Sequence, residues 1–324
     1  MPAEGVRWLP QQDILSFEEI REVVAASIEQ HGIRRFKLTG GEPTVRVGLV
    51  ELVRMLRSVD GIEDLSLTTN GMRLPELARP LRDAGLDRVT ISIDSLRPDR
   101  FHQITRTGDL ATVMKGLEAA EEAGLGVKIN CVTMRGVNDD EIADFARLSI
   151  DRNLTVRFIE YMPLGDAGLL EQTGEIDESE IGPAGGCGAQ DRGADSLVSE
   201  TVARSAIEAE LGPLQEVNRE SESGVGPASV YRLTRGNPRG RIGFISAMSA
   251  PFCATCNRLR LTATGVLRSC LFEGGEVSIR ELLRAGESPD SRRRQVADAM
   301  VQCVALKPEV HSNRGNEQMS RIGG

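Results

Sequence analysis

Apolar and polar positions along the first half of the chain follow two periods, and together they predict strands separated by helices. Short apolar runs predict buried strands over residues 33–38, 65–68, 88–93, 127–132 and 155–159. Apolar residues at helical spacing predict helices over residues 49–59, 74–84 (broken near Pro80), 110–123 and 139–150. A capping box, Ser16–Glu19, begins a further helix that ends near His31. Strands alternating with helices are typical of a parallel α/β sheet or barrel.

Polar and glycine residues gather where these strands end. They include Thr39-Gly40-Gly41-Glu42, Thr68-Thr69-Asn70, Ser92, Asn130 and Glu160. Each alone is adequately explained as a turn or a helix cap, but their repetition favours a ligand site, because ligands bind at this edge of parallel α/β folds. Lys37 and Lys128 lie inside apolar strands, where an unpaired lysine is costly to bury. Either they extend outward to solvent, or they face one opening together and bind an anionic ligand.

The composition changes after the fifth predicted strand. Residues 164–229 are rich in Gly, Glu, Ser and Asp and predict a flexible connection with one helix over 196–211. Strands return over 230–248, and helices follow near 279–285 and 291–306. We therefore expect a partial barrel over 1–163, this connection, and a C-terminal domain over 230–324.

Three cysteines gather in the C-terminal domain. Cys253 and Cys256 form a C-x-x-C pair, and Cys270 follows Cys256 after 13 residues. A hairpin turning near 263–265 would return Cys270 to the pair, with Arg258 and Arg260 on one strand face. Three thiolates beside two arginines are suited to holding a metal centre and an anion together.

Several interpretations of this cysteine group are possible. A C-x-x-C pair also suits a redox site or half of a zinc site. Structural zinc needs four ligands, and here Cys187, Cys303 or His311 would have to supply the fourth from a distance. An iron–sulfur cluster held by three cysteines leaves one iron open, and the spacing favours this reading. Cys131 and Cys303 have apolar neighbours and are predicted core residues, while Cys187 is predicted to be a free thiol.

Composition narrows the class of protein. The formal net charge is −9 and aromatic residues make up 3% of the chain, which argues against a nucleic-acid-binding protein. Six cysteines, three of them clustered, indicate metal rather than disulfides and favour a reducing compartment. No apolar run approaches the ~18 residues of a membrane span, and no signal peptide begins the chain. We expect a cytoplasmic protein with neither a membrane nor a nucleic-acid partner.

An ordered set of motifs resembles one known family. The set consists of T-G-G-E-P, L-T-T-N-G, V-K-I-N-C-V, R-F-I-E-Y-M-P, F-C-A-T-C-N-R-L-R-L, R-S-C-L-F and a terminal G-G. It resembles the GTP 3′,8-cyclases, radical S-adenosylmethionine enzymes that begin molybdenum cofactor synthesis. The resemblance implies an α/β fold, an incomplete parallel (β/α) barrel with a C-terminal extension carrying an iron–sulfur site. It also implies conversion of GTP to (8S)-3′,8-cyclo-7,8-dihydroguanosine 5′-triphosphate by radical chemistry.

The resemblance also implies roles for individual residues. The 4Fe–4S cluster, whose open iron contacts the GTP base, would be held by Cys253, Cys256 and Cys270. The positions matching GTP contacts are Lys37, Thr68, Lys128, Arg258, Leu259 and Arg260. Those matching the S-adenosylmethionine site are Gly41, Glu42, Ser92 and Met162. Gly323–Gly324 resembles a tail that reaches into the active site, and the family suggests a homodimer.

One departure from the family pattern stands out. The family's first cluster uses a C-x-x-x-C-x-x-C motif near the N-terminus, and this motif is absent from the 324 residues. Because M-P-A-E-G resembles the residues that follow it, we expect the chain to begin just after the motif and to be inactive as a radical enzyme in this form. The alternative hypothesis is therefore a catalytically dead relative that binds a nucleotide or zinc.

Overall fold

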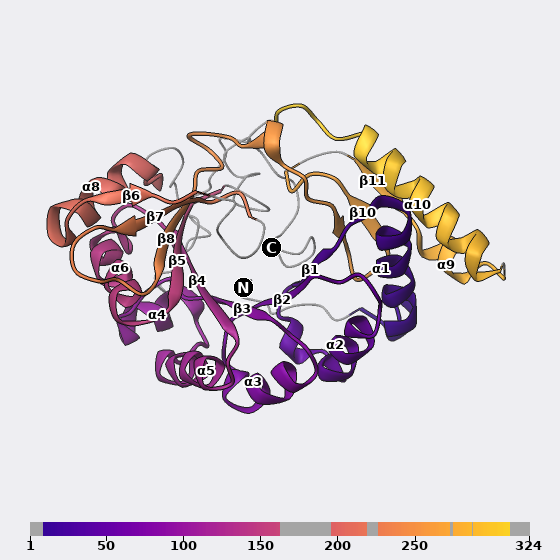
Figure 1. Ribbon diagram of the computed structural model, residues 1–324, viewed down its shortest axis with the longest axis horizontal. Helices are drawn as coiled ribbons and strands as arrows, with labels where there is room; N and C mark the ends of the chain where they lie inside the picture. Colours follow the sequence, from indigo (N-terminus) through magenta and orange to yellow (C-terminus); the bar gives the residue numbers. More distant parts are fainter. Residues whose placement is uncertain (1–8, 163–195, 219–225, 273–274, 287, 312–324) are drawn as a thin grey trace, which may run out of the picture.

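A curved eight-stranded sheet lies at the centre of the molecule, with helices along its outer side (Figure 1). The computed structural model describes residues 9–162, 196–218, 226–272, 275–286 and 288–311. The strand order is β1-β2-β3-β4-β5-β8-β7-β6. The strands are β1 (Arg35–Leu38), β2 (Asp64–Thr69), β3 (Arg88–Ser92), β4 (Gly126–Thr133), β5 (Leu154–Glu160), β6 (Leu214–Glu216), β7 (Ser229–Leu233) and β8 (Arg241–Ile245). Strands β1 to β5 and β8 run parallel, whereas β7 and β6 are antiparallel.

Helices connect the parallel strands and cover one face of the sheet. They are α1 (Phe17–His31), α2 (Leu49–Arg57), α3 (Leu74–Asp83), α4 (Pro98–Thr105), α5 (Leu110–Glu122), α6 (Ile142–Asp151) and α8 (Glu200–Leu211). Two further helices, α9 (Arg280–Arg284) and α10 (Pro289–Ala305), follow later in the chain, and α10 packs on α1. Among the described strands β1 pairs with β2 alone, so the sheet does not close. The predicted incomplete parallel barrel is confirmed. No described helix has both the length and the apolar character needed to cross a membrane.

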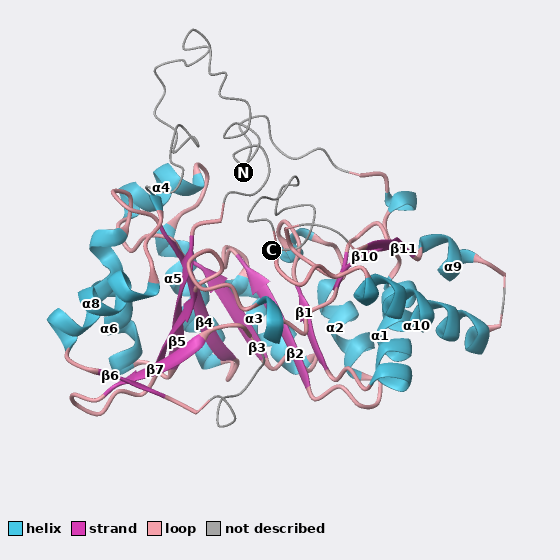
Figure 2. Cartoon of the chain, turned by 90° about the horizontal axis from the view of Figure 1, so that it is seen from above, coloured by secondary structure: helices cyan, strands magenta, loops and turns pink. Residues whose placement is uncertain are grey.

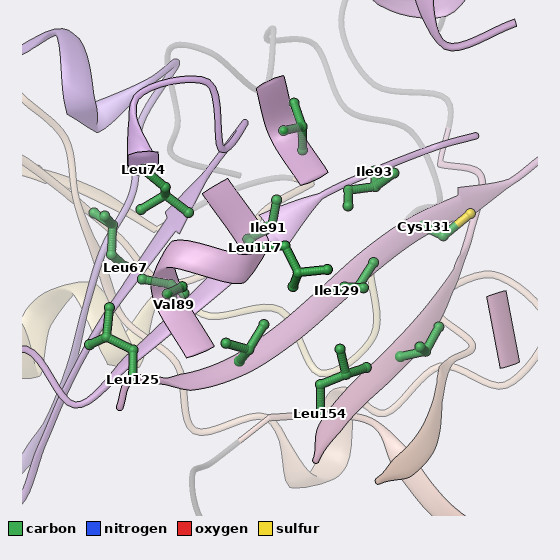
Figure 3. Packing of buried hydrophobic residues seen from close by; sticks show 14 of the residues in the cluster. Leu67, Leu74, Val89, Ile91, Ile93, Leu117, Leu125, Ile129, Cys131 and Leu154 are labelled. Atoms are coloured by element: carbon green, nitrogen blue, oxygen red, sulfur yellow. The ribbon is translucent and has the colours of Figure 1, made fainter. Parts of the chain in front are cut away.

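The two faces of the sheet differ because successive side chains of a strand point to opposite sides. Figure 3 shows Leu67, Val89, Ile91 and Ile129 of the strands packing toward Leu117 of α5. All of them are fully buried. The residues between them, which are mostly polar, therefore point to the inner face of the curve.

Local signals predicted most elements correctly. The Ser16 capping box is present at the start of α1, and Gly32 ends this helix with φ = 64°. The break expected near Pro80 was wrong, since α3 continues through this residue. Pro80 is exposed, so water can reach the Glu76 carbonyl that loses its intrahelical donor. Helix α4 and the strands β6 and β11 (Glu276–Ser278) were not predicted.

A small antiparallel sheet carries the cysteine segment. Its strand order is β11-β10-β9, with β9 (Arg260–Leu261) and β10 (Val266–Arg268) forming the expected hairpin. This sheet and α10 pack on α1 through a second apolar core, beside β1 (Figure 2). Its members are Leu15, Val23, Ala26, Leu267, Ile279, Leu283, Val296, Ala299, Met300 and Cys303. The backbone N–H of Leu15 also donates to the Ala263 carbonyl at 2.7 Å.

Some predictions concern residues outside the described ranges. Cys187, Gly323–Gly324 and much of the expected connection over 164–229 lie there. The predicted helix over 196–211 is present as α8. Strands β7 and β8, beyond the boundary drawn at 229, pair within the barrel sheet, and the division into three parts stays a prediction.

Leu267→Ala tests how firmly the cysteine hairpin is docked on α1. Leu267 is 1% exposed in the second core. We expect the substitution to lower the free energy of unfolding by about 2–5 kcal/mol, measured by urea denaturation, because it leaves a cavity. Val301→Ala on the exposed side of α10, where Val301 is 56% exposed, is the control and should change stability by less than about 0.5 kcal/mol. Equal effects of the two substitutions would contradict this docking.

Candidate active site

The inner face of the sheet carries rows of polar side chains. Thr68 of β2, Thr90 of β3 and Lys128 of β4 are register partners and stand side by side. One level nearer the carboxyl ends, Ser92 of β3, Asn130 of β4 and Arg157 of β5 form a second row. The parallel register therefore brings together residues that are up to 65 positions apart in the sequence.

Arg157 is the most deeply buried cation of this face, with 7% of its surface exposed. Its Nε donates to Asn130 Oδ1 at 2.9 Å, and Nη2 lies 3.3 Å from Thr90 Oγ1. Burial, together with the charge of Arg88, lowers its pKa to about 10. Both of these partners are neutral, so the hydrogen bonds orient the positive charge without cancelling it.

Lys37 and Arg88 extend this group of cations. Burial, together with the charges of Arg157, Lys128 and Arg88, lowers the pKa of Lys37 to about 7. Lys37 is exposed on the inner face, so water still stabilises part of its charge, and the direction of the shift is what matters. Arg88 pairs with Asp64, yet its buried Nη1 forms no hydrogen bond within the described part of the chain. An anionic ligand would satisfy this donor and neutralise the surrounding charge.

Sequence reasoning found Lys37 and Lys128 but missed Arg157. The signal was the same in all three cases, a cation between apolar neighbours in a strand. Val156 and Phe158 are buried on the helix side, and the alternation of side chains then directs Arg157 to the inner face.

The three cysteines lie in one short segment, and each is half-buried. Cys253 begins a 3-10 turn, Cys253–Thr255, and the N–H of Cys256 donates to the Cys253 carbonyl at 3.1 Å. Cys270 follows β10 by two residues. Within the described residues, however, no three His, Cys, Asp or Glu side chains are close enough together to hold a metal ion. The ligand set therefore stays a prediction.

The surroundings of Cys256 suit a thiolate. Burial opposes ionisation, but hydrogen bonds from the backbone and side chain of Arg258 and from Lys307 lower the Cys256 pKa to about 7. The Lys307 ammonium also donates to the Cys256 carbonyl. A deprotonated sulfur with N–H donors around it is the form in which cysteine binds iron or zinc. These donors therefore suit Cys256 to be one ligand of a metal centre held by thiolates.

The two arginines of the hairpin lie close to these sulfurs. Burial and Arg258 lower the pKa of Arg260 to about 10, whereas the neighbouring Cys256 and Cys270 thiolates act in the opposite direction. The Arg258 guanidinium lies over the Phe252 ring, 5.1 Å from its centroid. Leu259, between the arginines, is partly buried and packs against the second core.

Comparisons with known proteins agree with this arrangement. Residues 3–149 match the Radical SAM superfamily, and residues 154–313 match Molybdenum Cofactor Synthesis C. The chain is 43% identical to a GTP 3′,8-cyclase of Pelotomaculum thermopropionicum, with 100% of this chain and 92% of the relative aligned. It is 44% identical to the GTP 3′,8-cyclase of Moorella thermoacetica over the same shares. The chain belongs to the GTP 3′,8-cyclase family.

Similarity to solved structures is much weaker. Methylornithine synthase shares 18% identity and a TM-score of 0.36 with the chain, over 44% of this chain and 43% of that protein. A score this low supports no argument, and the assignment to the GTP 3′,8-cyclase family depends on the sequence relatives.

The residues that resemble the family's S-adenosylmethionine site lie at one end of the sheet. Glu42 and Gly41 follow β1, Ser92 ends β3, and Met162 follows β5. Both oxygens of Glu42 are engaged: Oε1 accepts from Thr44 and from the Thr69 hydroxyl at 2.7 Å, and Oε2 accepts from the Asn70 N–H at 2.7 Å. Glu42 therefore ties the glycine turn to the end of β2.

The lowered pKa of Lys37 predicts a pH dependence of stability. Its pKa is about 7 in the folded chain, and its ordinary value is 10.5. Between these values the unfolded state binds more protons, so the contribution of Lys37 to the free energy of unfolding should rise with pH. Urea denaturation of the wild type and Lys37→Met at pH 6.5 and 9 checks this expectation. The difference between the two proteins should shrink at pH 9, and a difference that is constant with pH would contradict the shift.

Proposed function

We propose that this chain is a GTP 3′,8-cyclase that converts GTP to (8S)-3′,8-cyclo-7,8-dihydroguanosine 5′-triphosphate in molybdenum cofactor biosynthesis. The relatives that align with the whole chain carry this name. The observation that carries the proposal is the group of cations on the inner face, Lys37, Lys128, Arg88 and Arg157. A triphosphate is the part of GTP that such a group would bind. None of the comparisons supports a catalytically dead relative.

The residues divide between the two ends of the nucleotide. Lys37, Lys128 and Arg157 would neutralise the phosphate oxygens, and Thr68, which pairs with Thr90 in the register, would donate a hydroxyl hydrogen bond. Arg258 and Arg260 would bind the nucleotide from the cysteine hairpin, with the backbone of Leu259 between them. Fixing both ends orients the ribose toward the reacting centre.

The metal centre and S-adenosylmethionine belong to the same proposal. Cys253, Cys256 and Cys270 would hold a 4Fe–4S cluster, with Arg258 and Lys307 as hydrogen-bond donors to Cys256. Gly41, Glu42, Ser92 and Met162 would line the S-adenosylmethionine site. When bound, S-adenosylmethionine would supply the 5′-deoxyadenosyl radical for the ribose of GTP, and the electron that cleaves it would come from a first cluster whose C-x-x-x-C-x-x-C ligands are not among these 324 residues. We also propose a cytoplasmic homodimer that has no nucleic-acid partner.

Iron analysis tests the cluster ligands. After anaerobic reconstitution with iron and sulfide, the wild type should bind about four iron atoms at this site. Cys253→Ser, Cys256→Ser and Cys270→Ser should each lose most of this iron, because a ligand is removed. Cys187→Ser is the matched control and should keep it. Zinc without iron or acid-labile sulfide in the wild type would instead favour the zinc-binding relative.

Nucleotide binding tests the cationic group. Arg157→Met should raise the dissociation constant of GTP roughly 10- to 100-fold, measured by calorimetry, because a charge-assisted hydrogen bond is worth about 1.5–3 kcal/mol. Arg147→Met is the control, since Arg147 pairs with Asp144 and Glu210 on the helix side of the sheet. Unchanged affinity in Arg157→Met would remove this arginine from the phosphate site, and turnover of GTP to the cyclised product tests the reaction itself.

A further inference from the structure

Glu160, the last residue of β5, carries a buried carboxylate that the proposed chemistry does not use. The residue is 3% exposed. Its Oε2 accepts the backbone N–H groups of Met248 and Ser249, each at 2.9 Å, and its Oε1 accepts the Ser249 hydroxyl. All three of these hydrogen-bond donors belong to the loop after β8. Within the described part of the chain, the carboxylate is therefore held by hydrogen bonds from this loop.

That loop leads directly into the cysteine segment. Met248 and Ser249 follow β8, and Cys253 comes only four residues after Ser249. From this point the chain runs along the open side of the curved sheet to the hairpin beside α1 (Figure 1). The second apolar core fixes the far end of this segment, where it enters the hairpin. At the near end, the three hydrogen bonds to Glu160 fix the loop to the barrel.

The proposed GTP site has two halves, one on the sheet and one on the segment that runs along its open side. Lys37, Lys128 and Arg157 belong to the sheet, whereas Arg258 and Arg260 belong to that segment. A nucleotide that contacts both sets needs their separation to be constant to within a fraction of an ångström. A carboxylate fixed on β5, the strand that also carries Arg157, is well placed to maintain that separation.

We infer that Glu160 is a positioning residue, which holds the beginning of the cysteine segment in register with the phosphate-binding cations of the sheet. The inference rests on the proposed function, because it assumes that one GTP molecule spans both halves. Its role is geometric: it contacts neither the nucleotide nor the cysteines and acts through Met248 and Ser249.

A purely structural role is the main alternative, and the chain offers a matched control. Glu141 is fully buried and accepts hydrogen bonds from Ser95 Oγ at 2.8 Å and from the Leu96 N–H at 2.6 Å. It also pairs with Arg100. Glu141 holds a loop in the same way, but that loop lies between β3 and α4 and carries no part of the cysteine segment.

The experiment compares Glu160→Ala, Glu160→Gln and Glu141→Gln in the anaerobically reconstituted full chain. We expect Glu160→Ala to raise the GTP dissociation constant at least about 10-fold, since a misplaced binding group can cost up to 100-fold. Its iron content should stay near that of the wild type, because the cysteine segment itself is intact. Hydrogen exchange of residues 246–256 should become faster, and Glu160→Gln, which keeps one acceptor oxygen, should be intermediate. Glu141→Gln should lower the melting temperature but leave GTP affinity within about twofold of the wild type.

The outcomes distinguish a failure of the proposed function from a failure of the role assigned to Glu160. A wild type that binds no GTP overturns the proposed function. A wild type that binds GTP, with unchanged affinity in Glu160→Ala, overturns the inference alone, and so does an equal loss in Glu141→Gln. If Glu160→Ala does not fold, Ser249→Ala removes only the hydroxyl donor and should still raise the dissociation constant about 2- to 5-fold. Unchanged affinity and unchanged exchange in that variant also overturn the inference.

Discussion

The gathering of positive charge on the inner face of the sheet constrains the rest of the structure. The charges of Arg157, Lys128 and Arg88 lower the pKa of Lys37, the charge of Arg88 lowers that of Arg157, and Asp64 opposes the effect on Lys37. Such a group destabilises the folded chain by repulsion and desolvation. A ligand with several negative charges reverses both effects. The site therefore suits a polyanion, and binding of the polyanion should stabilise the folded chain.

The opposite face of the same strands explains how this charge is tolerated. Leu67, Val89, Ile91 and Ile129 are fully buried against the helices, and each large apolar side chain contributes about 1.5–3 kcal/mol of burial free energy. Because the period of a strand is two residues, the packing that fixes these side chains also fixes the direction of the cations between them. A register slip of one residue would bury the charges in the core, and the apolar face therefore enforces the geometry of the polar one.

The sequence predicted those features that depend on neighbours along the chain. The five first strands, the Ser16 capping box and the β9–β10 hairpin follow from local periodicity and turn chemistry. The place of β8 beside β5 did not follow, because that pairing joins strands separated by more than 80 residues. Arg157 was missed although its strand carries the same local signal as those of Lys37 and Lys128, a cation between apolar neighbours. Its contacts with Thr90 and Asn130, in contrast, depend on the register of the sheet.

The metal ligands of the cysteine segment also depend on contacts that the sequence alone does not give. Spacing indicated a metal centre, and the resemblance assigned its ligands, but a ligand set depends on where three sulfur atoms lie in space. The low pKa of Cys256 and the nearness of Arg260 to Cys256 and Cys270 come from the hairpin fold. These properties favour thiolates whichever metal binds, so they support the donor set without choosing between iron and zinc.

The separation of the cations into two sets makes the nucleotide part of the architecture. One set belongs to the sheet and the other to a segment that is joined to the sheet at Glu160 and to α1 at the second core. A ligand that binds both sets must strengthen that junction, and by thermodynamic linkage a firmer junction must bind the ligand more tightly. Under the proposed function, one coupling free energy therefore links the binding of GTP to the ordering of the cysteine segment, and each favours the other.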